Sequence, residues 1–126
     1  MNKILIDKEN NIEIKDNAVE LDIQVTDLTL NIKGKVLIQE ISKKDNEELN
    51  LTINIEPNSS LIYNRFIIHN KADNKINLIQ QNNSKATLNY SLVANDKVRL
   101  GIDSTLSGDN NETEIKIAAV TEQNGS

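Results

Sequence analysis

The single histidine, His69, is the first residue to consider for chemistry. An imidazole acts as a general acid–base or as a metal ligand only where partner groups converge on it. Its sequence neighbours are Asn70, Lys71 and Asp73, and no Gly-x-Ser-x-Gly context marks a partner serine. We therefore expect His69 to lie at a strand end or in a turn, without a chemical role. A pocket in which it meets two carboxylates would instead indicate a small enzyme.

A group of acidic residues near the C-terminal end is the second candidate. Its members are Asp103, Asp109, Glu112 and Glu114, around Gly108. A calcium loop places oxygen ligands at alternate positions. The stretch DNNETE lacks the internal glycine of an EF-hand loop, and it does not match the glycine-rich calcium repeat of bacterial solenoids. We predict a solvated turn and assign no metal ligand here.

Arg65 and Arg99 are the only arginines, and a positioned arginine can anchor an interface. The simpler interpretation is an outward-facing strand residue paired with Asp or Glu. The glycines are isolated, so no phosphate-binding loop is formed, and the absence of Cys excludes a thiolate or redox site. We therefore predict no enzyme, no catalytic residue, no metal site and no cofactor, and the residues define no cofactor-binding set.

Charge and hydropathy limit the partners. The net charge of −5 argues against nucleic acid or an anionic membrane, because both need a basic footprint. Near the N-terminus only Ile4 to Ile6 form an apolar run, which is too short for a signal peptide. No stretch approaches membrane-spanning length, so we expect a cytoplasmic protein. A length of 126 residues favours one domain, 1–126, with less certain strands over 1–27 and a frayed tail over 122–126.

Alternation of apolar and polar residues dominates the chain and indicates β-strands with one buried face. The clearest ladder is Leu49, Leu51, Ile53 and Ile55. No segment sustains a helical period. The stretch Ser42–Glu48 has no apolar face and is predicted to be a solvated loop.

Clusters of Asn, Asp, Lys and Gly interrupt the ladders every ten to thirteen residues or so, roughly the rhythm of sandwiches, barrels and solenoids. They are Lys8–Asn11, Lys33–Lys35, Lys44–Glu47, Pro57–Ser60, Asn70–Asn74, Asn82–Lys85, Asn95–Lys97 and Ser107–Glu112. Two architectures fit. In an antiparallel β-sandwich, Asn95-Asp96 would close a two-residue hairpin. In a solenoid, each coil adds one strand to each of two stacked sheets.

A weak internal repeat favours the solenoid. The stretches LNLTINIEPNSSLIYNRF (Leu49–Phe66) and KINLIQQNNSKATLNYSL (Lys75–Leu92) align as strand, polar turn and strand with an aromatic. The pairs Leu51/Leu78 and Tyr63/Tyr90 are each 27 positions apart. We therefore predict coils of 27 residues in which these pairs stack on one another. Asn suits the turns because it tolerates left-handed backbone conformations.

The same stretch, LTINIEPNSSLIYNRFIIHN followed by NKINLIQQNNSKATLNYSL, resembles the β-helical core of the SufB/SufD family of iron–sulfur cluster assembly proteins. In STLSGDNNETEIKIAAVTEQNG, the residues at matching places are Leu106, Gly108, Asp109 and Gln123. The resemblance covers Leu28 to Gly125 and implies a short right-handed β-helix of SufD type. Family members are longer. They carry a His or Cys used in cluster assembly and a C-terminal helical segment that docks the ATPase SufC, and none of these roles transfers to this chain.

The resemblance implies a non-catalytic structural or accessory subunit of iron–sulfur cluster assembly that acts through protein–protein contacts. The expected partner is a second copy of the chain or a SufB/SufC-like protein. End coils of a solenoid need a cap or a partner, and the ladder Ile115, Ile117 and Ala119 is followed only by a short polar tail. The alternative is a structural β-solenoid module of a surface or adhesin-like protein.

Overall fold

The computed structural model describes residues 1–94 and 96–121, and all regular structure in this part of the chain is β. The strands are β1 (Asn2–Ile6), β2 (Asn11–Ile23), β3 (Asp27–Ile55), β4 (Ser60–Gln80), β5 (Lys85–Ala94), β6 (Val98–Leu106) and β7 (Glu112–Thr121). β-Branched Ile and Val favour this outcome because they pack well on a pleated surface. The predicted frayed tail, 122–126, lies outside the described residues.

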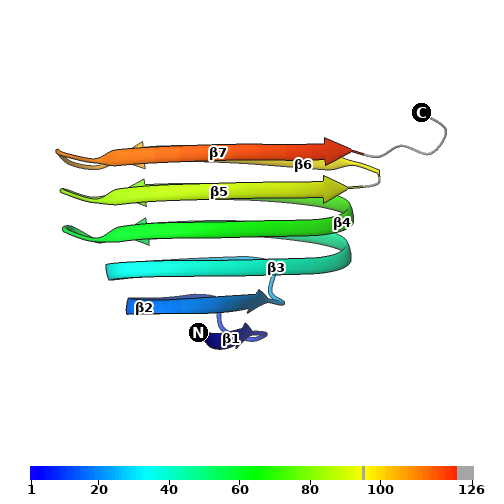
Figure 1. Ribbon diagram of the computed structural model, residues 1–126, viewed down its shortest axis with the longest axis horizontal. Helices are drawn as coiled ribbons and strands as arrows, with labels where there is room; N and C mark the ends of the chain where they lie inside the picture. The colour runs from blue at the N-terminus through cyan, green and yellow to red at the C-terminus, as the bar shows by residue number, and fades with distance from the viewer. Residues whose placement is uncertain (95, 122–126) are drawn as a thin grey trace.

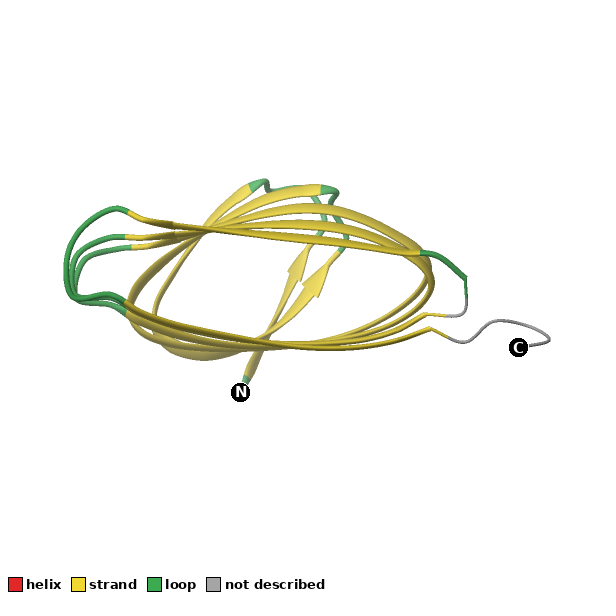
Figure 2. Cartoon of the chain, turned by 90° about the horizontal axis from the view of Figure 1, so that it is seen from above, coloured by secondary structure: helices red, strands yellow, loops and turns green. Residues whose placement is uncertain are grey.

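The strands stack in parallel. β1, β2, β3, β4, β5 and β7 pair in this order, β6 pairs with β4, and each of these pairings is parallel. Figure 1 shows the stack from the N-terminus to the C-terminus, and Figure 2 shows the flattened oval that the chain traces when seen from above. The fold is therefore a parallel β-solenoid, as predicted, and the antiparallel sandwich is wrong.

The hairpin predicted at Asn95-Asp96 is also wrong. Asn95 itself lies outside the described residues, but the flanking strands are placed. β5 pairs with β4 and β7, whereas β6 pairs with β4 on the other side of the oval. β5 and β6 therefore do not pair with each other as a hairpin.

β3 and β4 are long because each bends around a corner of the oval while its pairing continues. Partner positions run through the bend from Ser42 beside Ile67 to Glu48 beside Asp73. The backbone N–H and C=O groups form hydrogen bonds with the neighbouring parallel strand through the bend. A stretch of polar residues can therefore remain part of the strand. The predicted breaks Lys33–Lys35, Lys44–Glu47 and Asn70–Asn74 lie within strands, so the prediction of a loop over Ser42–Glu48 is wrong.

The predicted coil length of 27 residues is wrong in the middle of the molecule. Leu51 lies beside Ile76, and Ile53 lies beside Leu78, which is an offset of 25. Tyr63 likewise lies beside Leu88 rather than Tyr90. Leu51 and Leu78 therefore lie on successive rungs, but two positions out of register. An alternating ladder hides such a slip, because a shift of two residues returns every side chain to the same face.

The rungs lengthen along the chain. Partners are 17 positions apart between β1 and β2, 18 and then 19 between β2 and β3, and 25 on both sides of β4. The offset rises to 26 between β4 and β6 and to 27 between β5 and β7. The short first rungs narrow the oval at the N-terminal end. Ile6 and Ile14 are accordingly 0% and 4% exposed although they lie in the first strands.

Asparagine forms the turns at one end of the oval. Asn58, Asn83 and Asn110 have φ angles of 60°, 57° and 60°, the left-handed region that the sequence predicts for such positions. Their side chains also stack, because the Asn83 amide donates to Asn58 at 3.2 Å and the Asn110 amide donates to Asn83 at 3.1 Å. The predicted strand end at Pro57 is confirmed, since β3 ends at Ile55.

The core consists of inward-facing, mostly aliphatic side chains stacked rung upon rung. Ile53 and Leu78 belong to one such column, and Ile38 and Leu88 lie on either side of the aromatic Tyr63 in another. Fully burying one such aliphatic side chain contributes roughly 1.5–3 kcal/mol to folding. Alternation therefore determines which face of each strand is inside.

Candidate functional site

Arg65 lies inside the solenoid, with 1% of its surface exposed. The sequence predicts an outward-facing arginine paired with an acidic residue, so its orientation is wrong while its acidic partners are present. Arg65 occupies an inward position of β4, between Tyr63 and Ile67 in the alternating pattern. A buried guanidinium is unfavourable unless its donors are satisfied.

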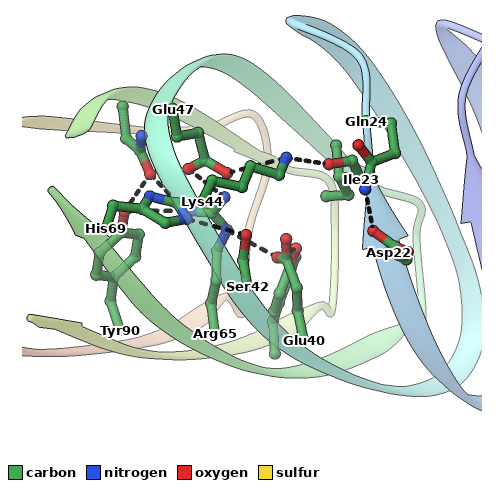
Figure 3. A network of polar contacts seen from close by, with 12 residues as sticks. Asp22, Ile23, Gln24, Glu40, Ser42, Lys44, Glu47, Arg65, His69 and Tyr90 are labelled. Carbon is green, nitrogen blue, oxygen red and sulfur yellow. Dashed lines mark hydrogen bonds and ion pairs between the residues drawn. The ribbon is translucent and has the colours of Figure 1, made fainter. Parts of the chain in front are cut away.

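Two glutamates from β3 satisfy Arg65, and all three are nearly inaccessible to solvent. Its Nε donates to Glu40 Oε1 at 2.7 Å, and its Nη2 donates to Glu47 Oε1 at 2.7 Å. The Tyr63 hydroxyl donates to the same Glu40 oxygen at 2.6 Å. Figure 3 shows Arg65 between the two carboxylates, which come from either side of the β3 corner.

Asn74 and Tyr90 complete this group of interacting side chains and connect the two sides of the oval. Arg65 Nη1 donates to the Tyr90 hydroxyl at 2.9 Å and to the Asn74 side-chain oxygen. The Tyr90 hydroxyl donates to that same Asn74 oxygen. We call Glu40, Glu47, Tyr63, Arg65, Asn74 and Tyr90 the buried charged cluster. Its members come from three successive strands, so it joins neighbouring rungs.

Burial and charge set the protonation of the buried charged cluster. Desolvation raises the pKa of the Glu40 carboxyl, and the neighbouring Arg65 only partly offsets this effect. Desolvation disfavours the Arg65 charge, yet Glu40 and the other surrounding acceptors outweigh it and raise the Arg65 pKa. Burial and the Glu40 charge likewise raise the pKa of Tyr63, so its hydroxyl remains a donor.

His69 lies next to the cluster and is 2% exposed. One ring nitrogen, Nε2, is 3.0 Å from the Ser42 hydroxyl, while Nδ1 makes no hydrogen bond with the described residues. Desolvation lowers the pKa of His69 below 6.5 despite the nearby Glu47 charge, which favours a neutral ring. An activated serine also needs a group that orients the histidine, and Nδ1 has no such contact here. Among the described residues, the Ser42–His69 pair is a buried hydrogen bond between side chains of β3 and β4.

The four acidic residues of the second candidate are exposed and spread over three elements. Asp103 lies on β6, Asp109 in the following turn, and Glu112 and Glu114 on β7. Glu112 lies 3.6 Å from Lys85, and Glu114 lies 3.0 Å from Lys116. Residues 1–94 and 96–121 hold no group of three His, Asp or Glu side chains placed to bind a metal ion.

The last rung leaves apolar side chains exposed at positions that are inward on the rungs before it. We call β6 and β7 together the terminal rung. Its side chains continue the inward columns of β4 and β5: Ile117 follows Tyr90, and Leu106 follows Gln80. Ile117 and Leu106 are nevertheless 52% and 54% exposed, whereas Tyr90 and Gln80 are buried. The end is open because no further described strand covers it.

The sequence carries a signal for the buried charged cluster in the spacing of its two glutamates. Glu40 follows Val36 and Ile38 at alternate positions, and Glu47 precedes Leu49 and Leu51 in the same way. A charged residue in phase with a ladder should face inward and require a partner. The bend between Glu40 and Glu47 interrupts the alternation in β3, so the inward position of the two glutamates is hard to recognise from the sequence.

Comparisons with family models, with curated proteins and with solved structures found no match to this chain. Fold and site therefore define its class: a parallel β-solenoid with a buried charged cluster and an open terminal rung. The part of the chain that the structure describes contains no helix able to cross a membrane.

Proposed function

We propose that this protein is a non-catalytic scaffold that works through protein–protein contacts at its terminal rung. The observation that carries the proposal is the exposure of Ile117 and Leu106 in columns that are otherwise buried. Free strand edges recruit further strands through backbone hydrogen bonds, and the apolar columns add area to such a contact. The buried charged cluster serves this role by joining the rungs from inside.

The more specific proposal is that the scaffold is an accessory subunit of iron–sulfur cluster assembly. It is supported by the sequence resemblance to the SufB/SufD core and by a solenoid architecture of the kind that this resemblance implies. Without Cys, the chain would hold or position its partners rather than bind a cluster through thiolates.

The test is binding to purified SufB-, SufC- and SufD-like proteins from the same source, measured by calorimetry and by co-elution. We expect a complex that is weakened by Ile117→Lys and unaffected by Ile41→Lys, because Ile41 is exposed on the outer face of β3. Failure to bind any of the three proteins would remove the iron–sulfur proposal. Finding the native protein at the cell surface would favour the adhesin-like module instead.

A further inference from the structure

We propose that the terminal rung pairs with the terminal rung of a second copy of this chain, around a two-fold axis near Ile117 and Gly101. In this dimer β7 lies antiparallel to β7 of the second copy, and β6 lies antiparallel to its β6. The inference rests on the proposed scaffold function, because it names a partner for the same contact surface.

The rung lengths argue for end-to-end pairing of like ends. A head-to-tail stack would place a rung with an offset of 27 on one with an offset of 17, so corners and strands would not coincide. The N-terminal rungs also bury their inward residues Ile6 and Ile14, unlike Ile117 and Leu106 at the other end. Two terminal rungs have the same length by symmetry, and a two-fold contact of this kind closes the assembly.

The buried charged cluster locates the axis. Tyr90 and Asn74 contact each other across the core and share Arg65 as a donor. One rung further, Ile117 lies beside Tyr90, and Leu100 lies beside Asn74. Ile117 and Leu100 therefore face each other across the open end. A single axis perpendicular to the strands can pass by Ile117 on β7 and by Gly101, the residue after Leu100, on β6.

Side-chain complementarity supports this axis. With β6 centred on Gly101, Arg99 faces Asp103 of the second copy, and Leu100 faces its Ile102. With β7 centred on Ile117, this residue meets its own copy, and Ile115 meets Ala119. At the outward positions nearest the axis on β7, Glu114 meets Val120 and Lys116 meets Ala118, so no like charges meet there. Opposite charges across antiparallel strands stabilise the pairing, and like charges would oppose it.

A second copy supplies both the apolar columns and two free strand edges.

The first test uses cysteine placement, because the chain has no Cys of its own. Gly101→Cys puts a thiol beside the proposed axis, where directly opposed antiparallel residues have Cα atoms about 4.5–5.5 Å apart, suitable for a disulfide. Lys75→Cys is the matched control, because Lys75 is the β4 partner of Gly101, one rung below. Under oxidising conditions we expect covalent dimers from Gly101→Cys and none from Lys75→Cys. Equal cross-linking of both variants would overturn the axis.

The second test is sedimentation of the cysteine-free protein over a concentration series. We expect a monomer–dimer equilibrium whose dissociation constant rises at least about tenfold in Ile117→Lys, a loss of about 1.4 kcal/mol, and stays unchanged in Ile41→Lys. Arg99→Asp and Asp103→Arg should each weaken the dimer, and the double variant should restore it. A monomer at the highest attainable concentration overturns the dimer even if a Suf-like partner binds. If the chain forms the dimer but binds no Suf-like protein, this inference stands and the iron–sulfur proposal is removed.

Discussion

At the scale of single residues, the central feature is a charge placed where an aliphatic side chain would be expected. Arg65 stands in a column of core positions and brings Glu40 and Glu47 inside with it. Such a group need not increase stability over a well-packed apolar core, because desolvation opposes the attraction. We expect it to fix register, since the observed contacts of Arg65 form with β3, β4 and β5 stacked at an offset of 25.

Removing the guanidinium should be costly. Arg65→Met leaves two carboxylates buried without a counter-charge, and we expect it to lower the free energy of unfolding by about 3–5 kcal/mol. Urea denaturation measures this loss. Lys75→Met on the same strand is the control and should change stability by less than about 0.5 kcal/mol, because Lys75 is exposed.

A triple variant separates charge from packing. Arg65→Met combined with Glu40→Gln and Glu47→Gln removes the unpaired charges and should recover part of the stability that Arg65→Met alone loses. Equal or lower stability of the triple variant would contradict an electrostatic origin of the effect.

His69 should make stability depend on pH. Its pKa is lower in the folded state than the unfolded value of 6.5, so the unfolded chain binds more protons between these two values. Stability from this group is therefore complete above 6.5 and is lost as the pH falls towards the folded pKa. Glu40, whose pKa is raised, acts in the opposite direction, because its contribution decreases as the pH rises above 4.5.

The comparison of wild type with His69→Gln isolates the histidine contribution. Between pH 7.5 and 5.5 we expect the wild type to lose stability more steeply than His69→Gln, by at most about 1.4 kcal/mol per pH unit. Chemical denaturation at several pH values measures both slopes. Parallel slopes would contradict a neutral buried imidazole.

At the scale of elements, the alternating apolar strands can be predicted from the sequence, whereas the bends within strands cannot. Alternation places Leu49 to Ile55 in a strand with one buried face, as observed. Polar stretches such as Ser42–Glu48 look like loops because local sequence does not reveal that a neighbouring rung continues the backbone ladder through the bend. Arg65 was misplaced for a related reason: its type suggests the surface, whereas its phase within Leu61, Tyr63 and Ile67 places it inside.

The asparagine turns can be tested at Asn83, which has a left-handed backbone and lies between two stacked Asn side chains. Asn83→Ala should lower the free energy of unfolding by roughly 1–2 kcal/mol, because the alanine Cβ makes the left-handed backbone conformation unfavourable. Asn83→Gly should cost less, since glycine adopts this conformation freely. Thermal or urea unfolding compares the two variants. Equal losses would mean that the side-chain ladder, rather than the backbone angle, determines the preference for Asn.

At the scale of the whole molecule, the protein is a one-dimensional stack with unequal ends. Each rung buries its apolar columns against its neighbours, so stability accumulates towards the middle and is lowest where a rung has one neighbour. The short first rungs bury Ile6 and Ile14, whereas the terminal rung leaves Ile117 and Leu106 exposed. This asymmetry between the two ends favours β6 and β7 as the proposed contact surface.

The stacking register underlies the cluster, the turns and the proposed axis, and paired cysteines test it directly. Thr52 lies beside Asn77 on the outer face, with an offset of 25, whereas Ile79 lies beside Asn54. Parallel neighbours about 4.8 Å apart allow a disulfide, and residues displaced by two positions do not. We predict that Thr52→Cys/Asn77→Cys oxidises to an intramolecular disulfide while Thr52→Cys/Ile79→Cys stays reduced. Preferential oxidation of the second pair would show coils of 27 residues and contradict the account.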